Sequence, residues 1–286
     1  MMSPLRPTGR DARTPVTLAV TSGKGGVGKT NVVVNLAVAL ARLHNRVAIL
    51  DADFGLGNVD VLLGLAPAGH LGHVLAGERS MRDILVEGPH GVQIVPATSG
   101  LRELTALTPR HWERLNRGLR EIGDELDFLL VDTGAGISNN VIDTLRGTGC
   151  VLVVTSPEPT AVVDAYAVIK VLTTSEAPSE LGVLVNGARD QAEADLVFRQ
   201  LEVAATRFLR RRLSSFGFVT DDPAVREAVI QQRAVVDLAP QSAASRCFRI
   251  LAARVATLAP PDGPGLRLVP RQCPSAVPVT EAPQCA

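Results

Sequence analysis

The sequence has few aromatic residues, no excess of charge of either sign and no long apolar run. Aromatic residues are 3% of the 286 residues although 46% are hydrophobic, so the core must consist of aliphatic side chains, as in buried parallel strands covered by helices. Lys plus Arg and Asp plus Glu both number 29, which gives no reason to expect specific nucleic-acid binding. No stretch could span a bilayer or act as a secretory signal, so we expect a cytoplasmic protein.

The four cysteines lack the spacing of a metal site or a redox motif. Cys150 begins an apolar run and Cys247 lies in a helical pattern, whereas Cys273 and Cys285 are close to the C-terminus. The first two are therefore predicted to be reduced thiols within the fold. A cysteine-bound metal or a dithiol centre is not predicted.

Short apolar runs alternate with amphipathic patterns between residues 15 and 258, which predicts a single α/β domain. A Pro-containing lead without periodicity, residues 1–14, is predicted to be flexible, and a tail with seven prolines, residues 259–286, to be disordered. The predicted strands are residues 16–21, 47–50, 92–95, 128–131, 150–155, 182–185 and 215–219, and the predicted helices are 31–43, 109–125, 139–146, 160–173, 192–210, 222–231 and 242–258. This order implies a three-layer fold with a mainly parallel twisted sheet flanked by helices.

Residues 23–30 (G-K-G-G-V-G-K-T) satisfy the phosphate-loop pattern G-x-x-x-x-G-K-[ST]. The glycines allow backbone N–H groups to surround phosphate oxygens at the start of a helix, where a partial positive charge favours anions. Lys29 is then expected to reach the outer phosphates, and the Thr30 hydroxyl to bind Mg²⁺. An apolar run precedes this loop and a helical pattern follows it, as a phosphate loop requires.

The same residues also match the dinucleotide fingerprint G-x-G-x-x-G, with Asp51 at the end of the next strand. Tyr166 and Lys170 have the spacing of a dehydrogenase Y-x-x-x-K motif. An NAD-dependent oxidoreductase is therefore an alternative. It leaves Lys29 and Asp132 without a role, so ATP binding is favoured.

Lys24 is not required by a general phosphate loop. With it, the loop resembles that of the deviant Walker A ATPases of the MinD/ParA group, whose signature is K-G-G-x-G-K-[ST]. This resemblance implies an ATP-bound homodimer in which Lys24 crosses the interface to the partner's nucleotide. A lysine placed in this way stabilises phosphate charge only when two chains meet.

Two acidic segments support this resemblance. Residues 51–60 (D-A-D-F-G-L-G-N-V-D) resemble switch I of the group, which implies that Asp53 positions the attacking water and Asp51 contacts Mg²⁺ through water, with Asp60 a solvated acid. Residues 132–137 (D-T-G-A-G-I) resemble switch II, which implies that Asp132 holds Mg²⁺ through water. Asn186 matches an adenine-contacting asparagine, a capping role being the alternative, and the absence of N-K-x-D favours ATP over GTP.

The resulting assignments are as follows. The predicted nucleotide-binding residues are Gly23, Lys24, Gly25, Gly26, Val27, Gly28, Lys29, Thr30, Asn31 and Asn186, the predicted Mg²⁺ contacts are Thr30, Asp51 and Asp132, and the predicted catalytic residues are Lys24, Lys29 and Asp53.

Within the group the sequence is most similar to the flagellar-number regulators of the FleN/FlhG branch. The similarity includes residues 159–170, with D-A-Y-A-x-I-K, and residues 221–235, with D-D-P-A-V-R-E-A-V-x-x-Q-R-A-V. It implies a slow, Mg²⁺-dependent ATP hydrolase that restrains a FleQ-like transcription activator. Other partners implied for the branch are FlhF and switch-ring proteins, and an alternative role is division-site or DNA positioning. A binding module that uses ATP only as a structural ligand, without hydrolysis, is a further alternative function.

Two segments differ from those of many relatives. Pro4, Pro7 and Pro15 interrupt the N-terminal stretch, where FlhG proteins often carry a helix that activates FlhF. The tail is broken by prolines where relatives have an amphipathic helix that docks on membrane. The shorter FleN form therefore fits better, and a polar or membrane-peripheral location stays open.

Overall fold

The computed structural model describes residues 14–54, 57–97, 107–174, 180–260 and 268. Eight strands form one sheet in the order β3-β4-β2-β5-β1-β6-β7-β8. All neighbouring strands are parallel except β3 and β4, so the predicted mainly parallel sheet is confirmed. The strands are β1 (Val16–Thr21), β2 (Val47–Ala52), β3 (Val86–Glu87), β4 (Gln93–Val95), β5 (Phe128–Thr133), β6 (Cys150–Thr155), β7 (Glu180–Ala188) and β8 (Ser214–Thr220).

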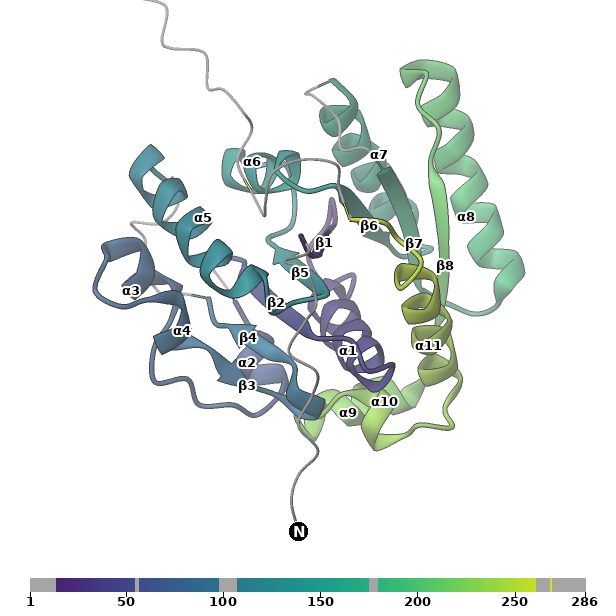
Figure 1. Ribbon diagram of the computed structural model, residues 1–286. Coiled ribbons are helices and arrows are strands. Elements are labelled where there is room, and N and C mark those ends of the chain that lie inside the picture. The colour runs from purple at the N-terminus through teal and green to yellow at the C-terminus, as the bar shows by residue number, and fades with distance from the viewer. Residues whose placement is uncertain (1–13, 55–56, 98–106, 175–179, 261–267, 269–286) are drawn as a thin grey trace, which may run out of the picture.

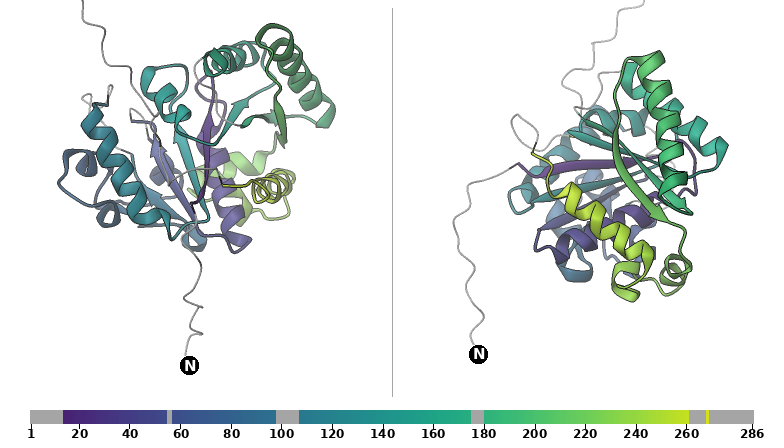
Figure 2. Two further views of the ribbon diagram at one scale, coloured as in Figure 1. Left: turned by 45° about the horizontal axis from the view of Figure 1, so that its top comes forward. Right: turned by 90° about the vertical axis from the view of Figure 1, so that its right-hand side faces the viewer.

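Helices cover both faces of the sheet, which gives the predicted three layers (Figures 1 and 2). One face packs against α1 (Lys29–Arg42), α2 (Val59–Leu62), α9 (Pro223–Ile230), α10 (Val235–Leu238) and α11 (Ala243–Val255). The other packs against α3 (Leu71–Ala76), α4 (Met81–Ile84), α5 (Pro109–Gly123), α6 (Asn139–Arg146), α7 (Pro159–Thr174) and α8 (Gln191–Ala204). Within strand β1, Leu18 and Val20 belong to the first core and Ala19 to the second. The core is thus mainly aliphatic on both faces, with a few aromatic side chains such as Phe248 and Trp112.

The carboxyl ends of the central strands bring the predicted site residues to one edge of the sheet. Strand β5 lies between β1 and β2, with Asp132 opposite both Val20 and Asp51. The phosphate loop follows β1 at this same edge. Parallel pairing therefore places the two carboxylates among the predicted Mg²⁺ contacts, Asp51 and Asp132, side by side at the edge that carries the loop.

The stretch between β2 and β4 contains elements that the sequence patterns do not reveal. Helices α2, α3 and α4 have four, six and four residues, and β3 has two, followed by the 3₁₀ turn η1 (Pro89–Gly91). Such elements are too short to show a helical or strand period. The predicted helix 192–210 also ends early, at Ala204, and continues as the π-helical turn η3 (Ala205–Leu209).

One residue of the predicted tail is part of the core. Leu268 is fully buried, and its N–H donates a 2.9 Å hydrogen bond to Oδ1 of Asn116 on α5. A side chain at Gly147, which follows α6, would overlap the Leu268 backbone. The lead 1–13 and the rest of the tail beyond residue 260 lie outside the described residues, and no helix in the described ranges is long and apolar enough to cross a membrane.

Candidate functional site

The phosphate loop joins β1 to α1 and has the open backbone that its glycines predict. Gly26 and Gly28 have φ angles of 80° and 89°, in the left-handed region. Gly28 caps α1, and no side chain caps the helix there, so the first N–H groups of the helix point into the loop without a partner from a capping side chain. A Cβ built at Gly25 or at Gly26 would meet no atom within 4 Å. The loop thus forms an anion site at a helix N-terminus.

Two other glycines of the loop allow close contact with neighbouring elements. A side chain at Gly23 would overlap the backbone of Asp164 on α7, and one at Gly28 would overlap the amide of Asn186. Asn186 donates a 2.8 Å hydrogen bond from Nδ2 to the carbonyl of Val27. Asn186, near the end of β7, therefore lies against the loop, and its contact with adenine stays a prediction.

We predict that Gly28→Ala destabilises the protein and abolishes nucleotide binding. Alanine at this left-handed φ costs about 1–2 kcal/mol, and its methyl group would displace Asn186 from the Val27 carbonyl. The melting temperature should fall by roughly 2–8 °C. Differential scanning fluorimetry without nucleotide measures this, with Gly25→Ala as the matched control because that position is open. Equal melting temperatures for the two variants would contradict the explanation.

The two lysines of the loop have opposite environments. Lys29 is 9% exposed and lies near Asp53 and Asp132. Burial lowers the pKa of Lys29, and the negative charges of the two carboxylates partly offset this by raising it. Lys24 has a side chain 40% exposed, and its Nζ is 2.6 Å from Oε2 of Glu158 and 3.3 Å from Oγ1 of Thr160. Lys29 is thus directed into the site and Lys24 lies at its rim.

Asp51 and Asp132 are each 1% exposed beneath the loop. The pKa of Asp51 is raised to about 8, mainly by burial and next by the charge of Asp132, while hydrogen bonds from the N–H groups of Val59 and Asp53 lower it. Burial also raises the pKa of Asp132 to about 6, against a hydrogen bond from Thr30 and the charge of Lys29. The site is therefore arranged for more positive charge than the protein itself supplies.

The donor atoms at this point fit a Mg²⁺ ion. Mg²⁺ prefers oxygen ligands and keeps several of its waters, and the side chains of Thr30, Asp51 and Asp132 supply oxygens. The buried Oδ1 of Asp132 has no hydrogen-bond partner among the described residues, so an ion or its water would satisfy it. No group of three or more His, Cys, Asp or Glu side chains in the described ranges could hold a metal ion by itself.

The raised pKa values predict that binding of Mg²⁺ with ATP releases protons. Since the folded pKa of Asp51 is about 8 against an ordinary 3.8, the folded protein keeps a proton at pH 7 that a bound cation would displace. Affinity should rise with pH, by up to about tenfold per pH unit for each proton released. Calorimetry at pH 7 in two buffers of different ionisation enthalpy should show nearly one proton more for the wild type than for Asp51→Asn. Equal proton release would contradict the prediction.

The same shifts set the pH dependence of stability without ligand. Between about pH 4 and pH 8 the native state holds a proton on Asp51 that the unfolded chain has lost, so the free energy of unfolding contributed by this group falls as pH rises through that range. Asp132 contributes in the same direction up to about pH 6.

Asp53, in the segment that resembles switch I, lies close to the segment that resembles switch II. The N–H of Asp53 donates a 3.1 Å hydrogen bond to Oδ1 of Asp51. A Cβ built at Gly134 would lie 3.5 Å from Oδ1 of Asp53. The N–H of Gly136 in turn donates to the Ser22 carbonyl at 2.8 Å, which attaches switch II to the start of the loop. The segments that resemble switch I and switch II thus meet next to Lys29.

A cavity of about 510 Å³ opens beside the loop. It is lined by residues that the sequence predicts, among them loop residues, Asn31 on α1 and Asn186, and by residues that the sequence did not reveal. The missed residues are Ser156, Pro157, Glu158, Gly187, Arg189, Glu193, Asp221, Val225 and Phe248. Ser156–Glu158 follow strand β6, and the rule that parallel strand ends gather at one edge could have identified them. Val225 and Phe248 come from distant helices, and no local pattern identifies them.

The two residues of the dehydrogenase-like Y-x-x-x-K spacing do not join this site. Tyr166 packs partly buried against the second core, and Lys170 is exposed on α7. Neither lines the cavity beside the loop. The geometry therefore favours the phosphate loop over the dinucleotide fingerprint.

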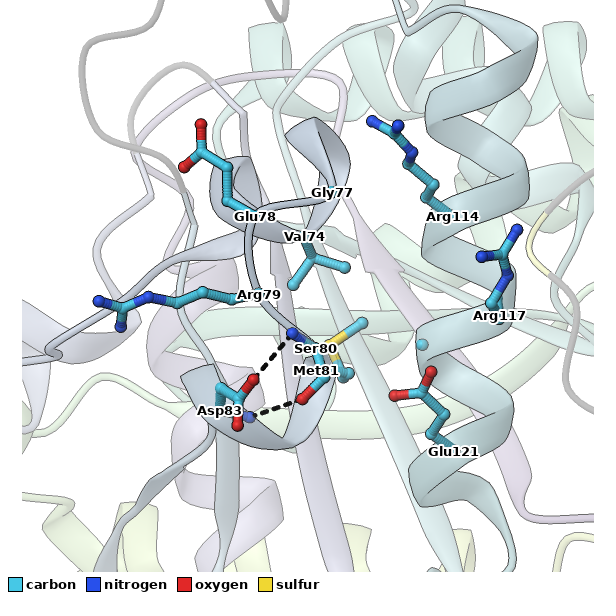
Figure 3. Close-up of a pocket in the computed structure, with 11 residues that line it drawn as sticks. Val74, Gly77, Glu78, Arg79, Ser80, Met81, Asp83, Arg114, Arg117 and Glu121 are labelled. Carbon is cyan, nitrogen blue, oxygen red and sulfur yellow. Dashed lines mark hydrogen bonds between the residues drawn. The ribbon is translucent and has the colours of Figure 1, made fainter.

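A second hollow, of about 420 Å³, lies between α3, α4 and α5 and shares no residue with the loop (Figure 3). Its rim carries charges of both signs, and Ser80 and Asp83 are paired with each other at the start of α4. Arg114 donates to the Leu75 carbonyl at the end of α3. Ser80 and Asp83 therefore cap α4, and Arg114 joins α5 to α3.

The buried Lys29, the open loop and the paired carboxylates define a P-loop nucleotide-binding protein. The sequence matches the ParA family, described as "NUBPL iron-transfer P-loop NTPase", over residues 14–256. The chain belongs to this family of P-loop NTPases.

Individual relatives show which members of the family the chain is similar to. The chain is 46% identical to the antiactivator FleN of Pseudomonas aeruginosa over 247 residues, 86% of this chain and 88% of that protein. It is 34% identical to the flagellum site-determining protein YlxH of Helicobacter pylori, over 78% of this chain and 76% of that one. The cell division ATPase MinD of Pyrococcus furiosus has a similar structure, with a TM-score of 0.72 and 26% identity, covering 85% of this chain and 99% of that one. The predicted resemblance to the MinD/ParA group and its flagellar branch is confirmed.

Proposed function

We propose that this protein is an ATP-driven dimerising switch that regulates flagellar number by restraining a FleQ-like transcription activator. The observation that carries the proposal is the 46% identity with an antiactivator across 86% of this chain and 88% of that protein. Similarity to YlxH, a flagellum site-determining protein, supports the same process.

The residues of the site would have separate roles in binding and hydrolysing ATP. Lys29 and the N–H groups of the first turn of α1 would hold the phosphates, and Thr30 with Asp132 would hold Mg²⁺, which supplies positive charge against the phosphates. Asp53, between Gly134 and Lys29, would orient the attacking water. Asn186 and the apolar lining from Val225 and Phe248 would surround the base.

Lys24 would act only when two chains meet. It is directed away from the buried carboxylates and pairs with Glu158, whose side chain is 64% exposed. An ion pair this exposed is weak, so Lys24 can exchange Glu158 for a partner's phosphates at little cost. Hydrolysis would remove that phosphate and let the dimer separate, which makes slow turnover a timer for partner release.

A deletion strain tests the proposed process. Loss of the gene should increase the number of flagella per cell, counted by electron microscopy, and wild-type protein but not Lys24→Ala should restore the number. The purified protein should also retain a FleQ-like activator on affinity resin with ATP and release it with ADP. Unchanged flagellar counts with misplaced septa would instead support the positioning role suggested by the structural similarity to MinD.

A binding module that uses ATP only as a structural ligand is the remaining alternative. Single-turnover measurements with radiolabelled ATP separate the two, because the proposed switch must form ADP on the enzyme. Absence of ADP with the partner present would favour the binding module.

A further inference from the structure

Exposed apolar and basic side chains gather where α8 ends. We call Val203, Arg207, Phe208, Arg210 and Arg212 the α8-end patch. Val203 is 63% exposed and Phe208 68%, among the highest values for large apolar side chains in the described residues. The three arginines are also exposed. Figures 1 and 2 show α8 on the outside of the molecule beside the edge strand β8.

The backbone holds this patch outward. The α-helix ends at Ala204 and widens into the π-helical turn η3, after which Arg210 adopts a φ of 53°. Ala205 is buried beneath the turn while Phe208 is left in solvent. Left-handed backbone at a residue other than glycine and π-helical turns are both uncommon and concentrate at functional positions. We therefore take the turn η3, which exposes Phe208, as a candidate binding surface.

The patch carries a local excess of positive charge on a neutral protein. Residues 203–213 contain four arginines and no acidic residue, and the acids that flank them in the chain are Glu202 and Asp221. Arg207 lies over the ring of Phe208, 5.4 Å from its centre. Among the described residues, Arg207, Arg210 and Arg212 have no ion-pair partner. Their charge is available to an anionic surface.

We propose that the α8-end patch binds the surface of an anionic phospholipid bilayer. The arginines would pair with lipid phosphates and acidic headgroups, while Phe208 and Val203 would enter the boundary between headgroups and acyl chains. Nucleic acid fits less well, because exposed apolar side chains gain nothing on a phosphate backbone. Three or four charges are also fewer than the phosphate contacts of typical DNA-binding proteins.

The patch is at the opposite end of the sheet from the nucleotide site. Helix α8 begins after the carboxyl end of β7 and runs back to the start of β8, so its end lies at the amino ends of the strands. The phosphate loop lies at the carboxyl ends. Binding through the patch therefore does not depend on the nucleotide, and its failure would leave the proposed switch untouched.

Sedimentation with vesicles tests this proposal on the full-length protein. Vesicles of phosphatidylcholine with phosphatidylglycerol should bind the protein equally with ATP and ADP, whereas phosphatidylcholine alone should bind at least tenfold less. Arg210→Gln combined with Arg212→Gln should weaken binding by about tenfold or more, since each arginine near an anionic surface contributes about fivefold. Phe208→Ser should weaken it severalfold without changing the salt dependence.

Matched control variants make the result interpretable. Ile230 on α9 has the same 68% exposure as Phe208, and Arg233 is exposed nearby, so Ile230→Ser and Arg233→Gln should leave binding unchanged. Circular dichroism and melting curves confirm that each variant is folded. The proposal is overturned by absent binding to anionic vesicles, by equal losses in the control variants, by binding that requires ATP, or by patch variants that lose DNA binding alone.

Discussion

A Lys24→Ala variant should bind ATP but fail to dimerise, and its hydrolysis rate should fall by about a hundredfold or more. The expectation follows from the position of Lys24 at the rim, 40% exposed and without contact to the buried carboxylates, so that its charge reaches phosphate only across an interface. Removal of one charged donor from a phosphoryl-transfer site typically costs this much or more. ATP binding by calorimetry and molar mass by light scattering measure the two properties separately.

Lys170→Ala is the matched control for this variant. Lys170 is the only other lysine apart from Lys29, and it is exposed on α7. Its removal should leave both dimerisation and turnover as in the wild type. A Lys24→Ala protein that dimerises with ATP and hydrolyses it normally would contradict a role in trans.

Asp53→Ala should also reduce turnover by about a hundredfold, yet it should preserve ATP binding and prolong the dimer. The carboxylate of Asp53 lies beside Gly134 and near Lys29, where it can hold water but is not needed to hold phosphate. Single-turnover hydrolysis measures the rate. Asp60→Ala controls for loss of an acid in the same segment, because Asp60 accepts a hydrogen bond from the N–H of Val61 at the start of α2. Unchanged turnover in Asp53→Ala would contradict the proposal that Asp53 positions the attacking water.

The sequence predicted the parts of the fold that are long or follow an exact pattern. Strands β1 and β6 and helix α6 have the predicted bounds, because an unbroken apolar run and a clear helical period each leave one interpretation. Pairing along β5 then places Asp51 beside Asp132, as expected for acids that end neighbouring parallel strands. The loop, the acids and Lys29 could thus be assembled from sequence.

Other features depend on contacts that no local pattern records. The ion pair of Lys24 with Glu158 joins residues 134 positions apart, and Phe248 reaches the cavity from the last helix. Leu268 was assigned to a tail because prolines surround it, although it fills a space opposite Gly147. The exposed Phe208 results from a π-helical turn, which has no sequence signature strong enough to predict.

The most direct test of the account is the molar mass of the Asp53→Ala protein, measured by light scattering during gel filtration with Mg²⁺ and either ATP or ADP. This variant should keep its ATP, so the two states can be compared without turnover. The account predicts twice the 30.2 kDa of one chain with ATP and a single chain with ADP. The same mass in both nucleotides, whether of one chain or of two, would contradict a dimer gated by ATP.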